Sequence, residues 1–190
     1  MTIADQIDFD AECLKTYFER LLVLADELSE IRPPVPDPNE VANNYNAELA
    51  KQFVADSVAA FIRPDMACNV YNFVDFYLGQ LCAYHRNRKG LALAHKDIRG
   101  HNELDAYDKY LTKVALLDLT AVTANLQGLH DLRKVRNFVT HSGAHVANDN
   151  HGLANINGVT VCGTLIVISD AFIWNALDHA RKYLSAVGRA

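Results

Sequence analysis

Apolar side chains recur every three or four residues along most of this chain, which is the spacing of amphipathic helices. In the N-terminal half, the pattern predicts three helices, over about residues 8–31, 39–62 and 65–89. A proline-rich connector at residues 33–38 separates the first two helices. The step Arg63-Pro64 separates the second from the third, because proline lacks the amide hydrogen that a helix interior needs.

The C-terminal half adds a short strand-like stretch. Residues 90–101 predict a loop, and residues 102–141 predict two helices or one helix kinked near residues 117–121. Asn157-Gly158 is a strong hairpin signal between residues 154–156 and 159–161, and residues 165–168 extend this stretch. Ser169 caps a last helix that Gly188 can end. We therefore expect an all-α fold, an up-and-down bundle of about five or six helices with a small β-hairpin before the last helix.

The composition fits one helical domain over residues 1–190, because a chain of 190 residues that is 50% hydrophobic can build one sizeable core. The net charge of −5 argues against a generic polyanion-binding surface, so any contact with RNA must be local. The four cysteines include no C-x-x-C pair and are expected to be reduced. No secretory leader or apolar stretch of membrane-spanning length is visible, and we expect a cytoplasmic protein without membrane contact.

The segment with the clearest chemistry ends the helix predicted up to residue 141. Arg136, Asn137 and His141 form the pattern Arg-Asn-x-x-x-His, and Gly143 follows. A guanidinium can hold a phosphate and an imidazole can transfer protons near neutral pH, so this pair fits phosphodiester cleavage. Asn137 and His141 share one helix face, whereas Arg136 and His141 diverge by about 140°. Joining that pair requires a fraying helix end or a second subunit.

The pattern resembles the HEPN domain family, which is all-helical and marked by an arginine, four to six residues and a histidine, usually with a polar residue after the arginine. The resemblance implies a dimeric, metal-independent endoribonuclease, often a toxin or defence effector, with the paired motifs facing one another. By position, Arg136 would hold the scissile phosphate, His141 would act on the 2′-hydroxyl or the leaving oxygen, and Asn137 would support them. RNA, a second copy of the chain and an antitoxin or other protein are the implied partners, and no cofactor is needed.

Basic residues around the motif are candidate substrate contacts, namely Arg133, Lys134 and His145. The spacing of His141, His145 and His151 makes them candidate zinc ligands, but Gly143 interrupts their helical presentation and we assign no metal. Phosphate-binding glycine loops and a G-x-S-x-G elbow do not occur in the sequence, which disfavours ATP-driven and serine-hydrolase chemistry.

Two observations qualify the motif: a second match occurs in the chain, and the same residues also fit an ordinary helix end. A second match, Arg88 and His95, is interrupted by Gly90 and is treated as coincidence. Arg136 and His141 also fit an ordinary helix end, with the arginine reaching water and the histidine near the last carbonyl groups. In that case the chain is a non-catalytic helical interaction domain or RNA-binding domain.

Overall fold

A computed structural model of the chain describes residues 1–30, 43–142, 152–162 and 165–190. Within these residues it has five α-helices and one two-stranded antiparallel sheet, which confirms the predicted all-α class with a hairpin before the last helix. The elements are α1 (Ile3–Glu30), α2 (Asn43–Lys89), α3 (Glu103–Lys109), α4 (Thr123–Ser142), β1 (Val159–Cys162), β2 (Leu165–Ile168) and α5 (Asp170–Arg189). None of the helices in this part of the chain has the length and hydrophobicity needed to cross a membrane.

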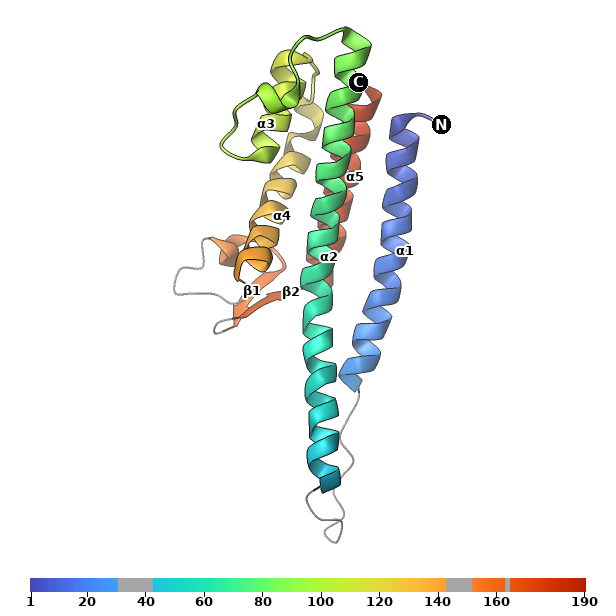
Figure 1. Ribbon diagram of the computed structural model, residues 1–190, viewed down its shortest axis with the longest axis vertical. Helices are drawn as coiled ribbons and strands as arrows, with labels where there is room; N and C mark the ends of the chain where they lie inside the picture. Colours follow the sequence, from blue (N-terminus) through green and yellow to red (C-terminus); the bar gives the residue numbers. More distant parts are fainter. Residues whose placement is uncertain (31–42, 143–151, 163–164) are drawn as a thin grey trace.

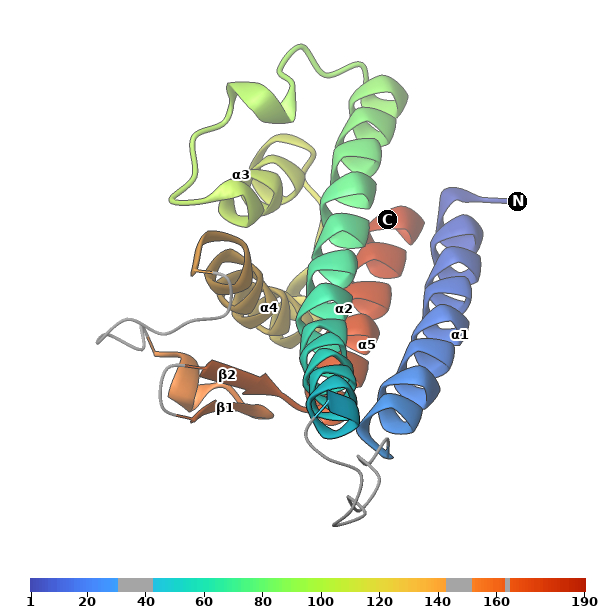
Figure 2. The same ribbon diagram turned by 60° about the horizontal axis from the view of Figure 1, so that its bottom comes forward.

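The four long helices alternate in direction along one axis, and α2 projects beyond its neighbours (Figure 1). Helices α1, α2 and α5 pack against one another, and α4 packs against α2 and α5. Both termini lie at the same end of the bundle, as Figure 2 also shows. Gly188 does not end α5 as predicted but lies in its last turn, where an added Cβ would come within 3.3 Å of the Ala4 Cβ. This glycine lets α5 approach α1 closely.

The hydrophobic core is shared by all four long helices. Each contributes side chains that are almost completely buried, among them Ile7 and Phe18 from α1, Met66 and Leu78 from α2, Leu132 from α4 and Leu184 from α5. Their removal from water is the main favourable term that holds the bundle together.

The predicted helix break at Arg63-Pro64 is wrong, because α2 runs through Pro64 as one helix of 47 residues. A proline inside a helix costs roughly 3 kcal/mol. Here Pro64 is buried within α2, and Met66 and Ala67 are completely buried in the core next to it. Arg63 also joins α2 to α5 through Asp170, with 2.6 Å between the Arg63 Nε and an Asp170 carboxylate oxygen. Tertiary packing on α1 and α5 therefore overrides the local preference of proline.

The predicted interruption near residues 117–121 is confirmed. After α3 the chain forms one π-helical segment, Tyr110–Val114, and a 3-10 turn, Thr120–Val122, leads into α4. Leu116 between them has a left-handed backbone with φ of 55°, which a helix cannot contain. Two helices rather than one kinked helix therefore occupy this stretch.

The hairpin exists, but its pairing differs from the prediction. Val159 lies opposite Ile168 and Cys162 opposite Leu165, so β1 pairs with the segment that was expected only to extend the stretch. The residues predicted as the first strand form a 3-10 turn, Leu153–Asn155. Gly158 does adopt the expected positive φ of 81°, but it leads into β1 instead of joining two strands. Burial of Leu153 and Ile156, three residues apart, fits a helical turn better than a strand.

Candidate functional site

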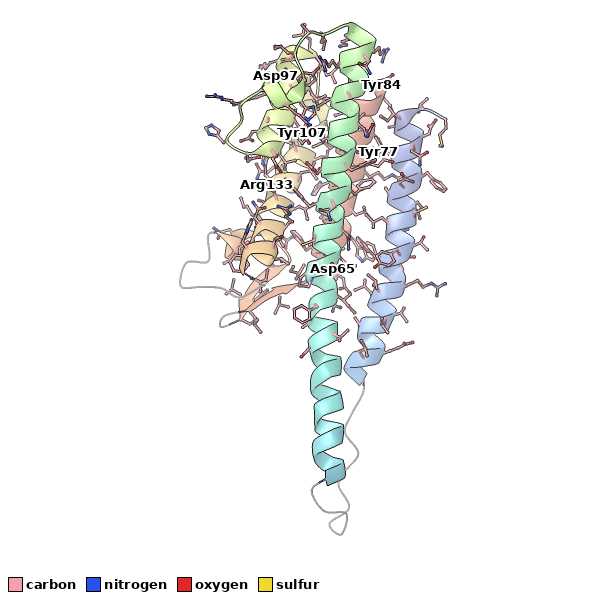
Figure 3. The ribbon with its side chains drawn as sticks, viewed as in Figure 1. Asp65, Tyr77, Tyr84, Asp97, Tyr107 and Arg133 are labelled. Carbon is pink, nitrogen blue, oxygen red and sulfur yellow. The ribbon has the colours of Figure 1, made fainter. Side chains whose placement is uncertain are left out.

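The predicted site residues lie along the second half of α4. This helix packs against α2 and α5, and the hairpin lies beside its C-terminal end (Figure 1). In Figure 3, Arg133 lies on α4 below the level of Tyr107 and above that of Asp65 on α2. The site is therefore built where α4 and α2 face each other in the middle of the bundle.

Arg136 is held in place from two sides. Its guanidinium carbon lies 4.9 Å from the centre of the Tyr71 ring on α2. Its Nη1 donates a hydrogen bond to the Asn137 side-chain oxygen at 2.9 Å. A guanidinium stacked on an aromatic face gains roughly 0.5–2 kcal/mol and loses freedom of movement. Arg136 is thus a fixed cation, and Asn137 contacts it directly.

His141 lies apart from this arrangement. It is exposed in the last turn of α4, five residues after Arg136. Among the residues that the structure describes, none forms a hydrogen bond or an ion pair with His141. Within the described residues no hydrogen bond joins the Arg136 and His141 side chains, and their helical spacing directs them to different faces of α4.

The three candidate substrate contacts have different surroundings. Lys134 is exposed and lies 2.9 Å from the Asp131 carboxylate in an ion pair along the helix surface. Arg133 is half-buried, and its Nε is a buried donor without a hydrogen-bond partner. His145 lies outside the described residues, as does His151. Of these candidates, Arg133 is therefore the one with a buried hydrogen-bond donor that has no partner.

Tyr71 belongs to the site, although it was not among the predicted site residues. It is 2% exposed, and burial, followed by the carboxylates of Glu103 and Asp75, raises the pKa of its hydroxyl to about 12. The guanidinium groups of Arg136 and Arg133 act in the opposite direction on the same pKa. The hydroxyl keeps its proton at neutral pH and has both cations in its neighbourhood. The sequence holds no signal for this, because 65 positions separate Tyr71 from Arg136.

A histidine–carboxylate pair that was not predicted lies one turn before Arg133. His130 Nε2 is 3.5 Å from an Asp105 carboxylate oxygen, and the second oxygen of Asp105 accepts a hydrogen bond from Asn102 at 2.8 Å. Asn102 caps α3, so this pair fastens the start of α3 to α4. We assign it a structural role.

The cysteines near α4 are not activated. Burial is the main cause that raises the pKa of the Cys68 thiol, against the opposing effects of Thr140 and Arg136. Burial raises the pKa of Cys82 to about 12. A thiol must ionise to act as a nucleophile, so neither cysteine fits that role.

The second arginine–histidine match does not form a site. Arg88 lies near the exposed end of α2, 5.9 Å from the Tyr84 ring centre. His95 lies on a separate 3-10 turn and stacks on Tyr107 with 5.1 Å between ring centres. The two side chains share no contact in the described structure.

A surface cavity of about 380 Å³ lies away from the predicted site. Its lining includes Asp108, Lys113, Asp118 and Tyr183, and none of the predicted site residues. In the part of the chain that the structure describes, no three histidine, cysteine or acidic side chains are grouped as metal ligands. The histidines considered for zinc lie partly outside that region.

Comparisons with known proteins do not assign this chain to a family. No protein-family model, no curated protein and no solved structure matches the chain.

Proposed function

We propose that this chain is a metal-independent endoribonuclease of the HEPN type that cleaves RNA with Arg136 and His141. The observation that carries the proposal is the state of Arg136, which is fixed by Tyr71 and Asn137. No carboxylate of the described residues forms an ion pair with it. A fixed cation without a carboxylate partner among the described residues, in a chain of net charge −5, suits a site for an anionic substrate.

The reaction that fits these residues uses the RNA's own 2′-hydroxyl. The 2′-oxygen attacks the phosphorus, the bond from phosphorus to the 5′-oxygen breaks, and the products carry a 2′,3′-cyclic phosphate and a 5′-hydroxyl. One base takes the proton of the 2′-hydroxyl and one acid returns a proton to the 5′-oxygen. His141 serves in proton transfer, and Arg136 stabilises the charge that develops on the phosphate.

A homodimer would supply both proton-transfer groups. One chain has a single motif histidine, and its position on α4 keeps it away from Arg136. A two-fold axis beside the C-terminal end of α4 would place His141 of one copy near Arg136 of the other. Arg133, Lys134 and His145 are then the candidate contacts to the flanking RNA. A toxin or defence role in the cytoplasm, with an antitoxin as partner, is the biological setting we propose.

The direct test compares the cleavage rate of full-length variants on single-stranded RNA. Arg136→Ala and His141→Ala should each lower the rate by about 100-fold or more, with an unchanged circular dichroism spectrum. Arg88→Ala is the matched control, because Arg88 also lies over a tyrosine ring but is not in the site. Wild-type rates from both motif variants would remove this site.

The chemistry has its own test. Cleavage should survive excess EDTA, leave a cyclic phosphate, and stop on DNA or on RNA methylated at the 2′-oxygen of the cut position. Loss of cleavage on chelation, restored by zinc, would instead favour a metal site. Light scattering should give twice the chain mass of 21.1 kDa. A clean monomer that still cleaves RNA contradicts the composite site.

The second candidate function is a non-catalytic interaction domain. It is favoured by large apolar side chains on the outer surfaces of α1 and α2, where Phe9 is 60%, Phe61 66% and Phe76 59% exposed. Such side chains are enriched at protein–protein interfaces. A folded chain that cuts neither RNA nor DNA would favour this alternative.

A further inference from the structure

Two half-buried arginines of α4 differ from Arg63, which is also half-buried. Arg63 pairs with Asp170, and Arg181 and Arg189 both pair with Asp8. Arg133 and Arg136, in contrast, have no carboxylate partner within 4.0 Å among the described residues. In a chain with 23 acidic and 18 basic side chains, two half-buried arginines without such a partner require a physical reason.

Arg133 and Arg136 lie on neighbouring turns of α4, and both influence Tyr71 on α2. Arg136 is stacked on that ring at 4.9 Å. Tyr71 keeps its proton and can donate a hydrogen bond. Three donors from α2 and α4 are thus gathered at one place.

Arg133 carries a buried donor that no acceptor among the described residues satisfies. Its Nε is buried from solvent, yet no hydrogen-bond acceptor contacts it. A buried donor without a partner is unfavourable in a folded protein and is uncommon outside functional sites. An acceptor bound beside Arg133 would remove this cost.

The acidic groups nearby limit what can bind. Glu103 and Asp75 are exposed and close enough to influence Tyr71, and Asp75 accepts a hydrogen bond from Tyr107 at 3.2 Å. They form no ion pair with either arginine within the described residues. Their charge opposes anions around Tyr71, so an anion bound there has to be held locally by the two guanidinium groups.

The geometry points to a phosphate-binding site made by Arg133 and Arg136 of the same chain, with the hydroxyl of Tyr71 as a third donor. Its ligand is a phosphate group of the RNA backbone, so the inference rests on the proposed function. Guanidinium groups bind phosphate oxygens through paired N–H donors, which an ammonium cannot reproduce. Arg133 thereby becomes a substrate-binding residue, separate from the surface pair of Lys134 with Asp131.

The test measures binding rather than cleavage. A fluorescent RNA with 2′-O-methyl groups throughout is titrated with the full chain, and the dissociation constant is read from anisotropy at several salt concentrations. Arg133→Gln should weaken binding by about tenfold or more and reduce the salt slope by about one. Arg133→Lys should recover only part of the loss. Lys182→Gln, which removes an exposed cation paired with Asp178 on α5, should stay within about twofold of wild type.

A second experiment measures the melting temperature with inorganic phosphate as the only ligand. It uses Arg133→Lys, so it tests the site even if Arg133→Gln does not fold. Phosphate should raise the melting temperature of the wild type and have a smaller effect on Arg133→Lys. RNA with and without a terminal phosphate distinguishes a backbone phosphate from an end group. Equal affinity of wild type and Arg133→Gln, or an absence of RNA binding by the wild type, overturns the site. If Arg133→Gln weakens RNA binding but the wild type never cleaves RNA, the phosphate-binding site is supported and the ribonuclease proposal is overturned. If the wild type cleaves RNA and Arg133→Gln cleaves it equally well, the ribonuclease proposal is supported and the phosphate-binding role of Arg133 is overturned.

Discussion

Arginines on α4 and on α5 lie in opposite surroundings. On α5, Arg181 and Arg189 lie 2.9 and 2.8 Å from the two carboxylate oxygens of Asp8 on α1. Ser185 completes this cluster with a hydrogen bond of 3.0 Å to the same carboxylate. On α4, Arg136 has an aromatic ring and an amide oxygen as partners instead.

This difference indicates that the arginines of α5 stabilise the fold, whereas Arg136 of α4 can bind a ligand. Burial opposes ionisation of Asp8, but the hydrogen bonds from Arg181 and Ser185 outweigh it and hold the pKa of Asp8 below its usual value. In that cluster both guanidinium groups have a carboxylate partner within the protein. The Tyr71 ring and the Asn137 amide hold Arg136 without cancelling its charge, so the cation stays available to a phosphate.

Among changes that exchange the partners of these arginines, the largest effect is expected from Asn137→Asp, which gives Arg136 a carboxylate partner like that of the arginines of α5. The new carboxylate would take the place of an oxygen now 2.9 Å from the guanidinium. RNA binding and cleavage should fall by about tenfold or more, because phosphate must compete with an internal anion, while stability should change by less than about 1 kcal/mol. Anisotropy, a cleavage assay and urea unfolding measure the three quantities.

Gln127→Glu is the matched control for that change, because it adds the same charge at an exposed position of α4. An equal loss of binding from both variants would mean that net charge, and not the Arg136 partner, sets affinity.

The reverse change, Asp8→Asn, removes the carboxylate from the arginines of α5. The free energy of unfolding should fall by about 1 kcal/mol at low salt and less at high salt, since both arginines are largely exposed. RNA cleavage should not change. Because the pKa of Asp8 is lowered by folding, the stability difference from wild type should be present above about pH 4 and shrink below it. Urea titrations at several pH values test this, and a loss of cleavage at unchanged stability would contradict the division of roles.

The smallest effect concerns His85, which fastens α2 to α5. It is completely buried, its Nε2 lies 2.9 Å from the Val187 carbonyl oxygen, and its Nδ1 has no partner. Burial, with smaller effects of Lys89 and Arg88, lowers the pKa of His85 against the opposing hydrogen bond to Val187. The unfolded state therefore binds the proton more readily, and stability should fall by at most about 0.7 kcal/mol between pH 7 and pH 6.

His85→Gln is the control for that profile, because glutamine can still donate to the carbonyl group but does not titrate. Chemical unfolding of this variant should depend less on pH over the same interval. An identical slope in both proteins would show that His85 does not contribute.

Structural features that depend only on neighbouring residues could be predicted from the sequence of one segment. Ser169 accepts a hydrogen bond from the Phe172 amide and caps α5 as its position predicts. The interruption near residues 117–121 was expected from the rarity of a forty-residue helix in a compact domain, and not from a local signal. Pro64 and the strand pairing were predicted wrongly, because each depends on the segments that pack against it. The apolar neighbours of Pro64 keep α2 intact, and Leu165–Ile168 pairs with Val159–Cys162.

The sequence by itself determined the helical class, the presence of a hairpin, and a segment of α4 that carries an arginine and an amide next to each other. Each of these depends on neighbours within a few residues, which periodicity and capping report directly. Only the tertiary structure decided that Tyr71 lies under Arg136, that Asp8 of α1 pairs with the arginines of α5, and that Arg133 keeps a buried donor without an acceptor. These facts depend on contacts between helices far apart in the chain, and a single sequence holds no local signal for which helix faces meet.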